Sequence, residues 1–193
     1  MNPQRTPADL LALLQADAAF DRLLRAARAL GLRHWCLAAG AVRNRAWDAW
    51  YGAGAEGFSD LDVDLVHFDP ALPCEADARL QAQLQQSCPG PHWDVVNQAH
   101  VHRWFRCSEG RSIPANRSLA EALGTWPETA TAVGVRLERD DRLSWVAPLG
   151  LTDLLMGQLR ANPRCPDPQA FTHRLRDKRW LDRWPRLGFP PPR

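Results

Sequence analysis

The chain is poor in lysine, in long apolar runs and in paired cysteines. Lys178 is the only lysine among 24 basic residues, so arginine carries nearly all of the positive charge. No run of about 18 apolar residues occurs, which argues against a membrane-spanning helix. The five cysteines are odd in number and show no Cys-x-x-Cys spacing, which argues against a disulfide framework and against a cysteine-based zinc site. These absences indicate a globular protein with buried thiols in a reducing compartment.

Charge and length narrow the class of protein further. The formal net charge is only +2, so no strongly basic surface is expected, and stable nucleic-acid binding is not expected either. The first residues, MNPQRTPADLLALLQ, lack the basic region and long apolar stretch of a secretory leader, which predicts a cytoplasmic protein without membrane association. With 193 residues and 45% hydrophobic content, the chain fits a single domain over residues 1–193.

Hydrophobic periodicity predicts three successive parts of that domain. An N-terminal helical segment covers residues 7–30, with a break that Asp17 could cap, and a core covers residues 35–107. A hairpin and C-terminal helices cover residues 118–185. Within these parts we expect strands at 35–39, 61–68, 93–96, 101–107, 132–137 and 143–146, and helices at 41–51, 75–86, 118–123, 149–160 and 169–184. This order predicts an α/β (α+β) fold, a small mixed sheet flanked by helices.

Three aspartates, Asp60, Asp62 and Asp64, alternate with aliphatic residues in the segment SDLDVDLVHF. Alternate residues of a strand point to the same face, so the three carboxylates would repel each other unless a cation lay among them. Adjacent carboxylates on a rigid strand are suitable ligands for Mg²⁺, which completes its shell with water and phosphate oxygens. A solvated edge strand is the alternative, but the aliphatic neighbours favour a buried strand.

A glycine turn precedes the aspartates in CLAAGAVRNRAW, where Gly40 stands between a predicted strand and a predicted helix. Glycine lets the backbone approach a ligand closely, and the N–H groups at a helix start favour a phosphate. Arg43, one helical turn later, can add charge-assisted hydrogen bonds. Taken alone, Gly40 is equally consistent with a simple turn, and Arg43 could instead pair with Asp48 or Asp64.

A third carboxylate is then expected on a neighbouring strand, where it would bind metal and help deprotonate a nucleophile. Asp94 in HWDVVNQ has the right place, after the intervening helix, although a surface acid at a strand end is the alternative. His100 and His102 have the spacing of a zinc-chelating pair, but no cysteine or acid completes a ligand set. A polar lining of an acceptor pocket, together with Asn97, or plain surface is therefore favoured.

The order of these motifs resembles a known superfamily. GAVRN at residues 40–44, followed by SDLDV at residues 59–63, resembles the nucleotidyltransferases that include DNA polymerase β and the CCA-adding enzymes. The chain is similar, more closely, to a bacterial nucleotidyltransferase-like family of unknown substrate. The stretches that carry this second resemblance, spread over most of residues 35–185, are AAGAVRNRAWDAWYG, SDLDVDLVHFDP, WDVVNQAHVHRW, TWPETATAVGVRL, APLGLTDLL and RLRDKRWLDRWP.

The resemblance implies a polymerase-β-like fold and Mg²⁺-dependent transfer of a nucleoside monophosphate from an NTP to an acceptor, with release of pyrophosphate. It implies that Asp60, Asp62 and Asp94 are catalytic and hold one or two Mg²⁺ ions. The implied contacts to the triphosphate are Gly40, Ala41, Arg43 and Asn44.

Further candidate substrate contacts are less specific. Trp126 and Thr129 could stack on a base and hydrogen-bond it, or form a packed turn, and the resemblance favours the pocket. Arg174 and Lys178 lie four residues apart on one predicted helix face, which suits phosphates or a solvated basic surface. Asn97 and His100 complete the set as polar residues of an acceptor pocket.

One departure from the superfamily pattern leaves a second function open. The turn reads Ala39-Gly40-Ala41, without the second glycine or the serine, so it lacks a hydroxyl that could contact a phosphate. The alternative is a non-catalytic nucleotide- or partner-binding module with the same fold. For an active enzyme, a small-molecule acceptor is favoured over a protein or an RNA, and the low net charge argues against tRNA in particular.

Overall fold

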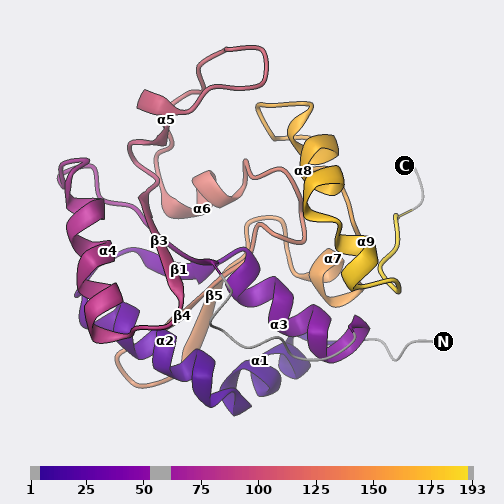
Figure 1. The fold of residues 1–193 in the computed structure, drawn as a ribbon, viewed down its shortest axis with the longest axis horizontal. Helices are drawn as coiled ribbons and strands as arrows, with labels where there is room; N and C mark the ends of the chain where they lie inside the picture. The colour runs from indigo at the N-terminus through magenta and orange to yellow at the C-terminus, as the bar shows by residue number, and fades with distance from the viewer. Residues whose placement is uncertain (1–4, 53–61, 191–193) are drawn as a thin grey trace.

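A five-stranded mixed sheet forms the centre of the protein in our computed structural model, which describes residues 5–52 and 62–190 (Figure 1). The strand order is β3-β2-β1-β4-β5. Only β2 and β3 pair in parallel, and the other neighbours pair antiparallel. The strands are β1 (Trp35–Ala38), β2 (Asp62–His67), β3 (His92–Asn97), β4 (Gly134–Leu137) and β5 (Leu143–Val146). The predicted small mixed sheet flanked by helices is confirmed.

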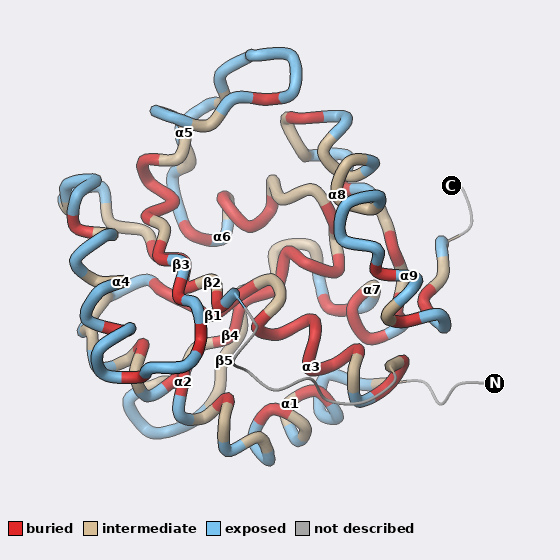
Figure 2. The backbone as a smooth tube through the Cα atoms, viewed as in Figure 1, coloured by how far each residue is buried: buried red, intermediate tan, exposed pale blue. Residues whose placement is uncertain are grey.

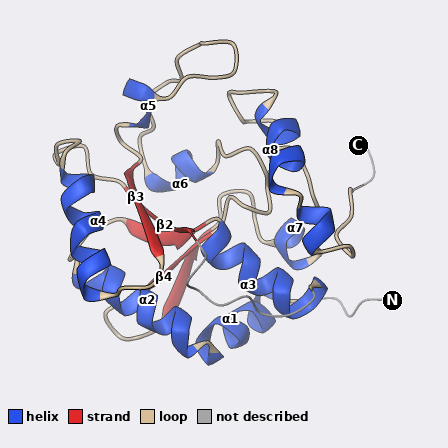
Figure 3. Ribbon diagram, viewed as in Figure 1, coloured by secondary structure: helices blue, strands red, loops and turns tan. Residues whose placement is uncertain are grey.

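Helices surround this sheet (Figure 3). The helices are α1 (Pro7–Ala16), α2 (Ala18–Ala29), α3 (Gly40–Tyr51), α4 (Ala76–Ser87), α5 (Val101–Trp104), α6 (Leu119–Leu123), α7 (Thr152–Leu155), α8 (Ala170–Lys178) and α9 (Trp180–Arg183). The predicted break in the first helical segment is confirmed, because the Asp17 carboxylate accepts from the N–H of Phe20 and caps α2. No helix in these described ranges is long and apolar enough to cross a bilayer.

The two faces of the sheet pack against different groups of side chains. Strand β1 shows the alternation: Trp35 and Leu37 join the main core with α1, α2, α3 and α4, while Cys36 and Ala38 face a smaller cluster that includes Leu123 of α6. Strand β1 and most of α3 are buried and β5 is only half-buried, whereas the segments around α4 and α5 carry many exposed positions (Figure 2). The cluster on the face toward α6 is the smaller of the two, and the candidate site lies on this face.

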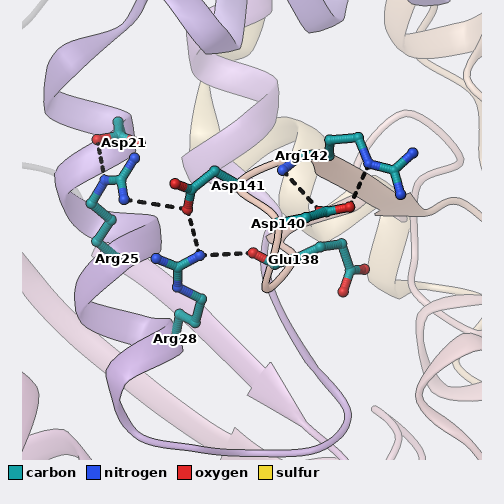
Figure 4. A network of polar contacts seen from close by, with 7 residues as sticks. All are labelled: Asp21, Arg25, Arg28, Glu138, Asp140, Asp141 and Arg142. Carbon is teal, nitrogen blue, oxygen red and sulfur yellow. Dashed lines mark hydrogen bonds and ion pairs between the residues drawn. The ribbon is translucent and has the colours of Figure 1, made fainter.

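The β4–β5 hairpin is attached to α2 by charged contacts at its turn (Figure 4). Arg28 donates to the backbone oxygen of Glu138 and to the carboxylate of Asp141, both at 2.7 Å. Arg25 pairs with Asp21 at 2.7 Å on its own helix and reaches Asp141 at 3.4 Å. The hairpin turn expected between the two last strands is confirmed, and these contacts fix it to α2.

Three predicted elements were wrong in type or extent. The strand expected at 101–107 is largely the short helix α5, because the chain turns away from the sheet at residues 98–100, and of the expected strand an isolated bridge from Arg106 to Ser112 is described. The helix expected at 149–160 shrinks to α7, since Gly150 and Gly157 adopt left-handed backbone conformations at its two ends. The helix expected at 169–184 divides into α8 and α9 at Arg179, which has a φ of 48°.

Candidate active site

The register of β2 and β3 gathers acidic side chains on the face toward α6. Asp62 pairs with His92 and Asp64 with Asp94 in the parallel ladder. Because alternate residues of a strand share a face, Asp62, Asp64 and Asp94 project to the same side of the sheet. Asp60, the first member of the predicted pair, lies outside the described residues.

The outermost of these carboxylates is open to solvent. The side chain of Asp62 has 71% of its area exposed, and one of its oxygens lies 3.1 Å from Nδ1 of His92, which is itself exposed. Partial burial and the negative charge of Asp62 raise the pKa of Asp94, while His92 opposes this effect. Asp62 and Asp94 therefore offer accessible oxygen atoms, suited to bind a metal, on neighbouring strands.

Asp64 lies deeper than Asp62 and Asp94, and the charges of both act on it. Burial raises the pKa of Asp64 to about 6, and the charges of Asp94 and Asp62 add to the increase, whereas Arg43 and Arg174 oppose it. Asp64 shares the face of Asp62, but the pairing of Asp64 with Arg43 that the sequence left open is not among the ion pairs of the described residues, and the two arginines only oppose the increase of its pKa. A cluster of acids that destabilise one another's charged forms is suited to binding a cation.

We predict that Asp64→Asn stabilises the metal-free protein at neutral pH. The carboxyl has an ordinary pKa near 3.8 in the unfolded chain, and the value of about 6 in the fold means that folding disfavours its charged form. The resulting loss of folding stability in wild type is absent below about pH 4 and grows as the pH rises. It reaches at most about 3 kcal/mol above about pH 6. Urea unfolding in EDTA should show the Asp64→Asn variant to be more stable than wild type by about 1–3 kcal/mol at about pH 7.5, with the difference gone near about pH 4. Equal stability of the two proteins across this range would contradict the description of Asp64.

The glycine turn lies at the same end of the sheet as the acids. Ala38, the last residue of β1, pairs with Asp64, so the start of α3 follows directly beside the carboxylates. Ala39 at the turn has φ 50° and ψ −121°, a conformation that favours glycine. The missing second glycine of the superfamily pattern thus coincides with backbone strain at Ala39.

Gly40 itself is not required by the packing of the protein. A Cβ atom built on it would meet Nδ2 of Asn44 at 3.4 Å and the Arg43 guanidinium at 3.8 Å, which are ordinary contacts with the ends of side chains. Gly134 offers a contrast, since a Cβ there would clash with the Cys36 side chain, whose own Cβ would lie only 2.9 Å away. The side chains of Asn44 and Arg43 therefore line the space over Gly40.

We therefore predict that Gly40→Ala folds normally but binds NTP about tenfold or more weakly, because the added methyl keeps phosphates from the helix start. The free energy of unfolding, followed by thermal denaturation, should change by no more than about 1 kcal/mol. Calorimetry with NTP and Mg²⁺ should show the loss of NTP affinity. Gly134→Ala is the matched control for a glycine that is required by packing, and it should lose stability. Unchanged NTP affinity in Gly40→Ala would remove the turn from the site.

Arg43 is a buried cation with unusual partners. It is 6% exposed, and its guanidinium donates to Oδ1 of Asn44 at 2.8 and 3.2 Å and to Oγ1 of Thr131 at 3.3 Å. Its charge lies 5.5 Å from the ring centre of Trp47 and 4.9 Å from that of Trp180. The expected pairing with Asp48 does not form, because Arg183 and Trp184 bind that carboxylate. Within residues 5–52 and 62–190, Arg43 has no carboxylate at ion-pair distance.

Of the other two basic candidates, Arg174 lies near Arg43 and Lys178 does not. Arg174 of α8 binds Oε1 of Glu128 through Nε at 2.7 Å, and its guanidinium lies 5.8 Å from the ring centre of Trp180. Burial and, less strongly, the charge of Arg174 lower the pKa of Arg43 to about 10, although Glu128 and Asp64 oppose the decrease. Lys178 is exposed at the end of α8. The structure brings Arg174 to the site and leaves Lys178 on the surface.

The polar candidates Asn97, His100 and Thr129 are engaged in contacts that stabilise loops. Asn97 points to the face opposite Asp94, and its amide binds backbone groups of Asp69 and Ala99. His100 is 5% exposed and its Nε2 lies 2.7 Å from the carbonyl oxygen of Leu72. Thr129 donates to the carboxylate of Asp153 at 2.6 Å. None of these three groups is directed at the carboxylates by its contacts.

Trp126 packs, half-buried, against the small cluster on the carboxylate face. Sequence reasoning missed Glu128, Thr131 and Trp180, which surround Arg43 and Arg174. The runs TWPETATAVGVRL and RLRDKRWLDRWP contain these residues, but nothing in either run pairs Glu128 with an arginine 46 positions later.

The donor chemistry of the site fits a divalent cation such as Mg²⁺, because accessible carboxylate oxygens are its preferred protein ligands. Asp62 and Asp94, with Asp60 before them in the chain, would hold it. Among the residues that the structure describes, no group of three His, Cys, Asp or Glu side chains already stands at metal-binding spacing. That finding also gives no support to a zinc site at His100 and His102.

Comparison with known proteins shows which family the chain belongs to. Residues 25–189, most of the chain, match the nucleotidyltransferase family. The chain belongs to that family. A solved structure described as revealing a CCA-adding enzyme head domain is 27% identical, covers 99% of both chains and superposes with a TM-score of 0.83. The resemblance to this superfamily and the polymerase-β-like fold that it implied are thereby confirmed.

More distant structures share the fold of this nucleotidyltransferase. The Thermotoga maritima CCA-adding enzyme in complex with tRNA is 15% identical, with a TM-score of 0.56 over 97% of this chain and 43% of its own. An apo form of a CCA-adding enzyme gives 15% identity and a TM-score of 0.53 over the same shares. The chain therefore spans less than half the length of these two enzymes. A search of curated proteins found no match.

Proposed function

We propose that this family member is an active, Mg²⁺-dependent nucleotidyltransferase that moves a nucleoside monophosphate from an NTP to an acceptor. The observation that carries the proposal is the meeting of opposite charges at one end of the sheet. Accessible carboxylates on β2 and β3 lie beside a glycine turn, and behind that turn Arg43 is buried without a carboxylate partner among the described residues. A buried cation is costly unless an anion compensates it, and a triphosphate bound at the turn would do so.

In the proposed reaction, an oxygen of the acceptor attacks the α-phosphorus of the NTP. The bond from that phosphorus to the oxygen bridging to the β-phosphorus breaks, and pyrophosphate leaves. Asp94 accepts the proton that the acceptor hydroxyl loses. Gly40 and Ala41 contribute backbone N–H groups to the phosphates, and Arg43, fixed by Asn44, adds positive charge behind them.

A bound Mg²⁺ would supply neutralisation of the triphosphate charge, and Asp60, Asp62 and Asp94 are the residues proposed to hold it. Most of the rate acceleration would then come from positioning and electrostatics, as in phosphoryl transfer generally. We propose a small-molecule acceptor over a protein or an RNA; a formal net charge of only +2 argues against RNA, whose phosphates need a basic surface. Trp126 is proposed to contact the base.

The experiment combines α-labelled NTP, Mg²⁺ and a panel of hydroxyl- and phosphate-bearing acceptors, with short RNAs included. Release of pyrophosphate together with transfer of the label to one acceptor class would support the proposal and identify the acceptor. Transfer to RNA alone would overturn the preference for a small molecule. An NTP that binds but never yields pyrophosphate with any acceptor would favour the second function.

That second function is a nucleotide-binding module without turnover, and one observation favours it. Ala39 occupies the glycine-type conformation of the turn at a cost of about 1–3 kcal/mol, and it offers no hydroxyl to a phosphate. A protein that only binds nucleotide tolerates such a loss more easily than an enzyme that must hold a transition state. The two functions are separated by turnover and not by binding.

A further inference from the structure

Glu128 is the most deeply buried carboxylate in the part of the chain that the structure describes, with 1% of its area exposed. It lies in the loop between α6 and β4. One oxygen, Oε1, accepts from Nε of Arg174 at 2.7 Å, whereas Oε2 has no hydrogen-bond partner among the described residues. A half-satisfied buried carboxylate is destabilising by itself, so its presence requires another reason.

The reason lies in the two guanidinium groups beside it. Arg43 and Arg174 both lie against the ring of Trp180, at 4.9 and 5.8 Å from its centre. Two like charges on one ring repel each other, and Glu128 supplies the negative charge that opposes this repulsion. The same loop also reaches Arg43, because Thr131 accepts from Arg43 while its N–H donates to the backbone oxygen of Glu128 at 3.2 Å.

The contact between Glu128 and Arg174 leaves the outer part of that guanidinium available. Only Nε is used, and the side chain of Arg174 keeps 35% of its area exposed. Within the described ranges its two terminal nitrogens donate no hydrogen bond. A guanidinium held by Nε and open at both terminal nitrogens is oriented for a two-pronged contact with a phosphate.

We infer that Glu128 is a positioning residue, which holds Arg174 and compensates one of two adjacent cations so that Arg174 and Arg43 form a subsite for the terminal phosphates of the NTP. This inference rests on the proposed function, since it assigns Glu128 a part in binding the same substrate. Three charges, two positive and one negative, leave one net positive charge, which a phosphate group would neutralise. The negative charge of Asp64 also acts on Arg43.

The test compares ATP, ADP and AMP binding to wild type and Glu128→Gln by calorimetry in Mg²⁺. Gln keeps the shape and an acceptor oxygen but removes the charge. We expect ATP affinity to fall about tenfold or more, ADP affinity less, and AMP affinity by less than about twofold. Arg174→Met should give the same pattern. The double variant should bind ATP no more weakly than Arg174→Met alone, because both changes remove one interaction.

Glu138→Gln is the control, since Glu138 also accepts from an arginine and from Ser144, but on the β4–β5 hairpin. It should leave all three affinities unchanged. Equal losses for ATP, ADP and AMP in Glu128→Gln, or unchanged ATP affinity in the folded variant, would show a structural role only and overturn the inference. If Glu128→Gln does not fold, Arg174→Met still tests the inference. An undiminished preference of Arg174→Met for ATP over AMP would overturn the inference. Failure of wild type to bind any of ATP, CTP, GTP and UTP would instead refute the proposed function itself.

Discussion

Asp62→Asn is expected to reduce nucleotide transfer by about 10²–10³-fold or more without destabilising the protein. The side chain is 71% exposed and its one side-chain contact in the described part of the chain is to His92, so folding does not depend on it. Its carboxylate is nevertheless an outer member of the acidic group that we propose to hold Mg²⁺. Removing the charge lowers metal affinity and leaves the triphosphate charge less neutralised. Initial rates at saturating NTP, measured over a range of Mg²⁺ concentrations, should show the loss and only partial rescue at high metal.

Asp94→Asn should behave in the same way, with an additional loss at saturating Mg²⁺ because Asp94 is also the proposed proton acceptor. The matched control is Asp140→Asn, an exposed aspartate that pairs with Arg142 in the β4–β5 turn. It should keep full activity. Full activity in Asp62→Asn and Asp94→Asn would show that the acids of β2 and β3 do not carry the chemistry.

Arg43→Met is expected to weaken NTP binding by about 10–100-fold while changing the free energy of unfolding by no more than about 1 kcal/mol. An arginine that stabilises the fold through a buried ion pair would lose about 3–5 kcal/mol on truncation. Arg43 instead donates to the neutral oxygens of Asn44 and Thr131, and methionine of similar length can occupy the space against Trp47 and Trp180. The cost of burying its charge is removed together with these bonds.

Arg43→Lys separates charge from shape. Lysine keeps the positive charge but cannot reproduce the planar contact with two rings and the paired donation to Asn44. We expect an NTP affinity between those of wild type and Arg43→Met, and calorimetry with parallel thermal denaturation measures both quantities. A large loss of stability in Arg43→Met, accompanied by unchanged NTP affinity in the folded fraction, would mean that Arg43 serves only the fold.

The elements that position the site were predictable from the sequence because their signals are local. Alternation in SDLDVDLVHF indicated a strand with its acids on one face, and Gly40 marked the start of α3. The segments that failed depend on contacts distant in sequence. Residues 101–107 have β-prone composition but leave the sheet, and Arg179 breaks the last helix so that Trp180 can pack against Trp47.

The side-chain partners of the site were not predictable for the same reason. The in-register pairing of Asp64 with Asp94 depends on how β3 aligns with β2 across an intervening helix. The ion pair of Glu128 with Arg174 joins a loop to a helix 46 positions later. Asn97, by contrast, carried a misleading signal, since a polar residue on a short strand suggested a pocket, and its amide in fact holds the loop at Asp69.

The central claim is that the acids of β2 and β3 bind a metal–nucleotide complex beside the glycine turn. Calorimetric titration of wild type and Asp62→Ala with ATP, CTP, GTP and UTP, each with Mg²⁺ and with EDTA, tests it most directly. The account predicts that wild type binds at least one NTP only when Mg²⁺ is present and that Asp62→Ala loses this binding. Failure of wild type to bind any NTP in Mg²⁺, or equal binding by Asp62→Ala, would contradict it.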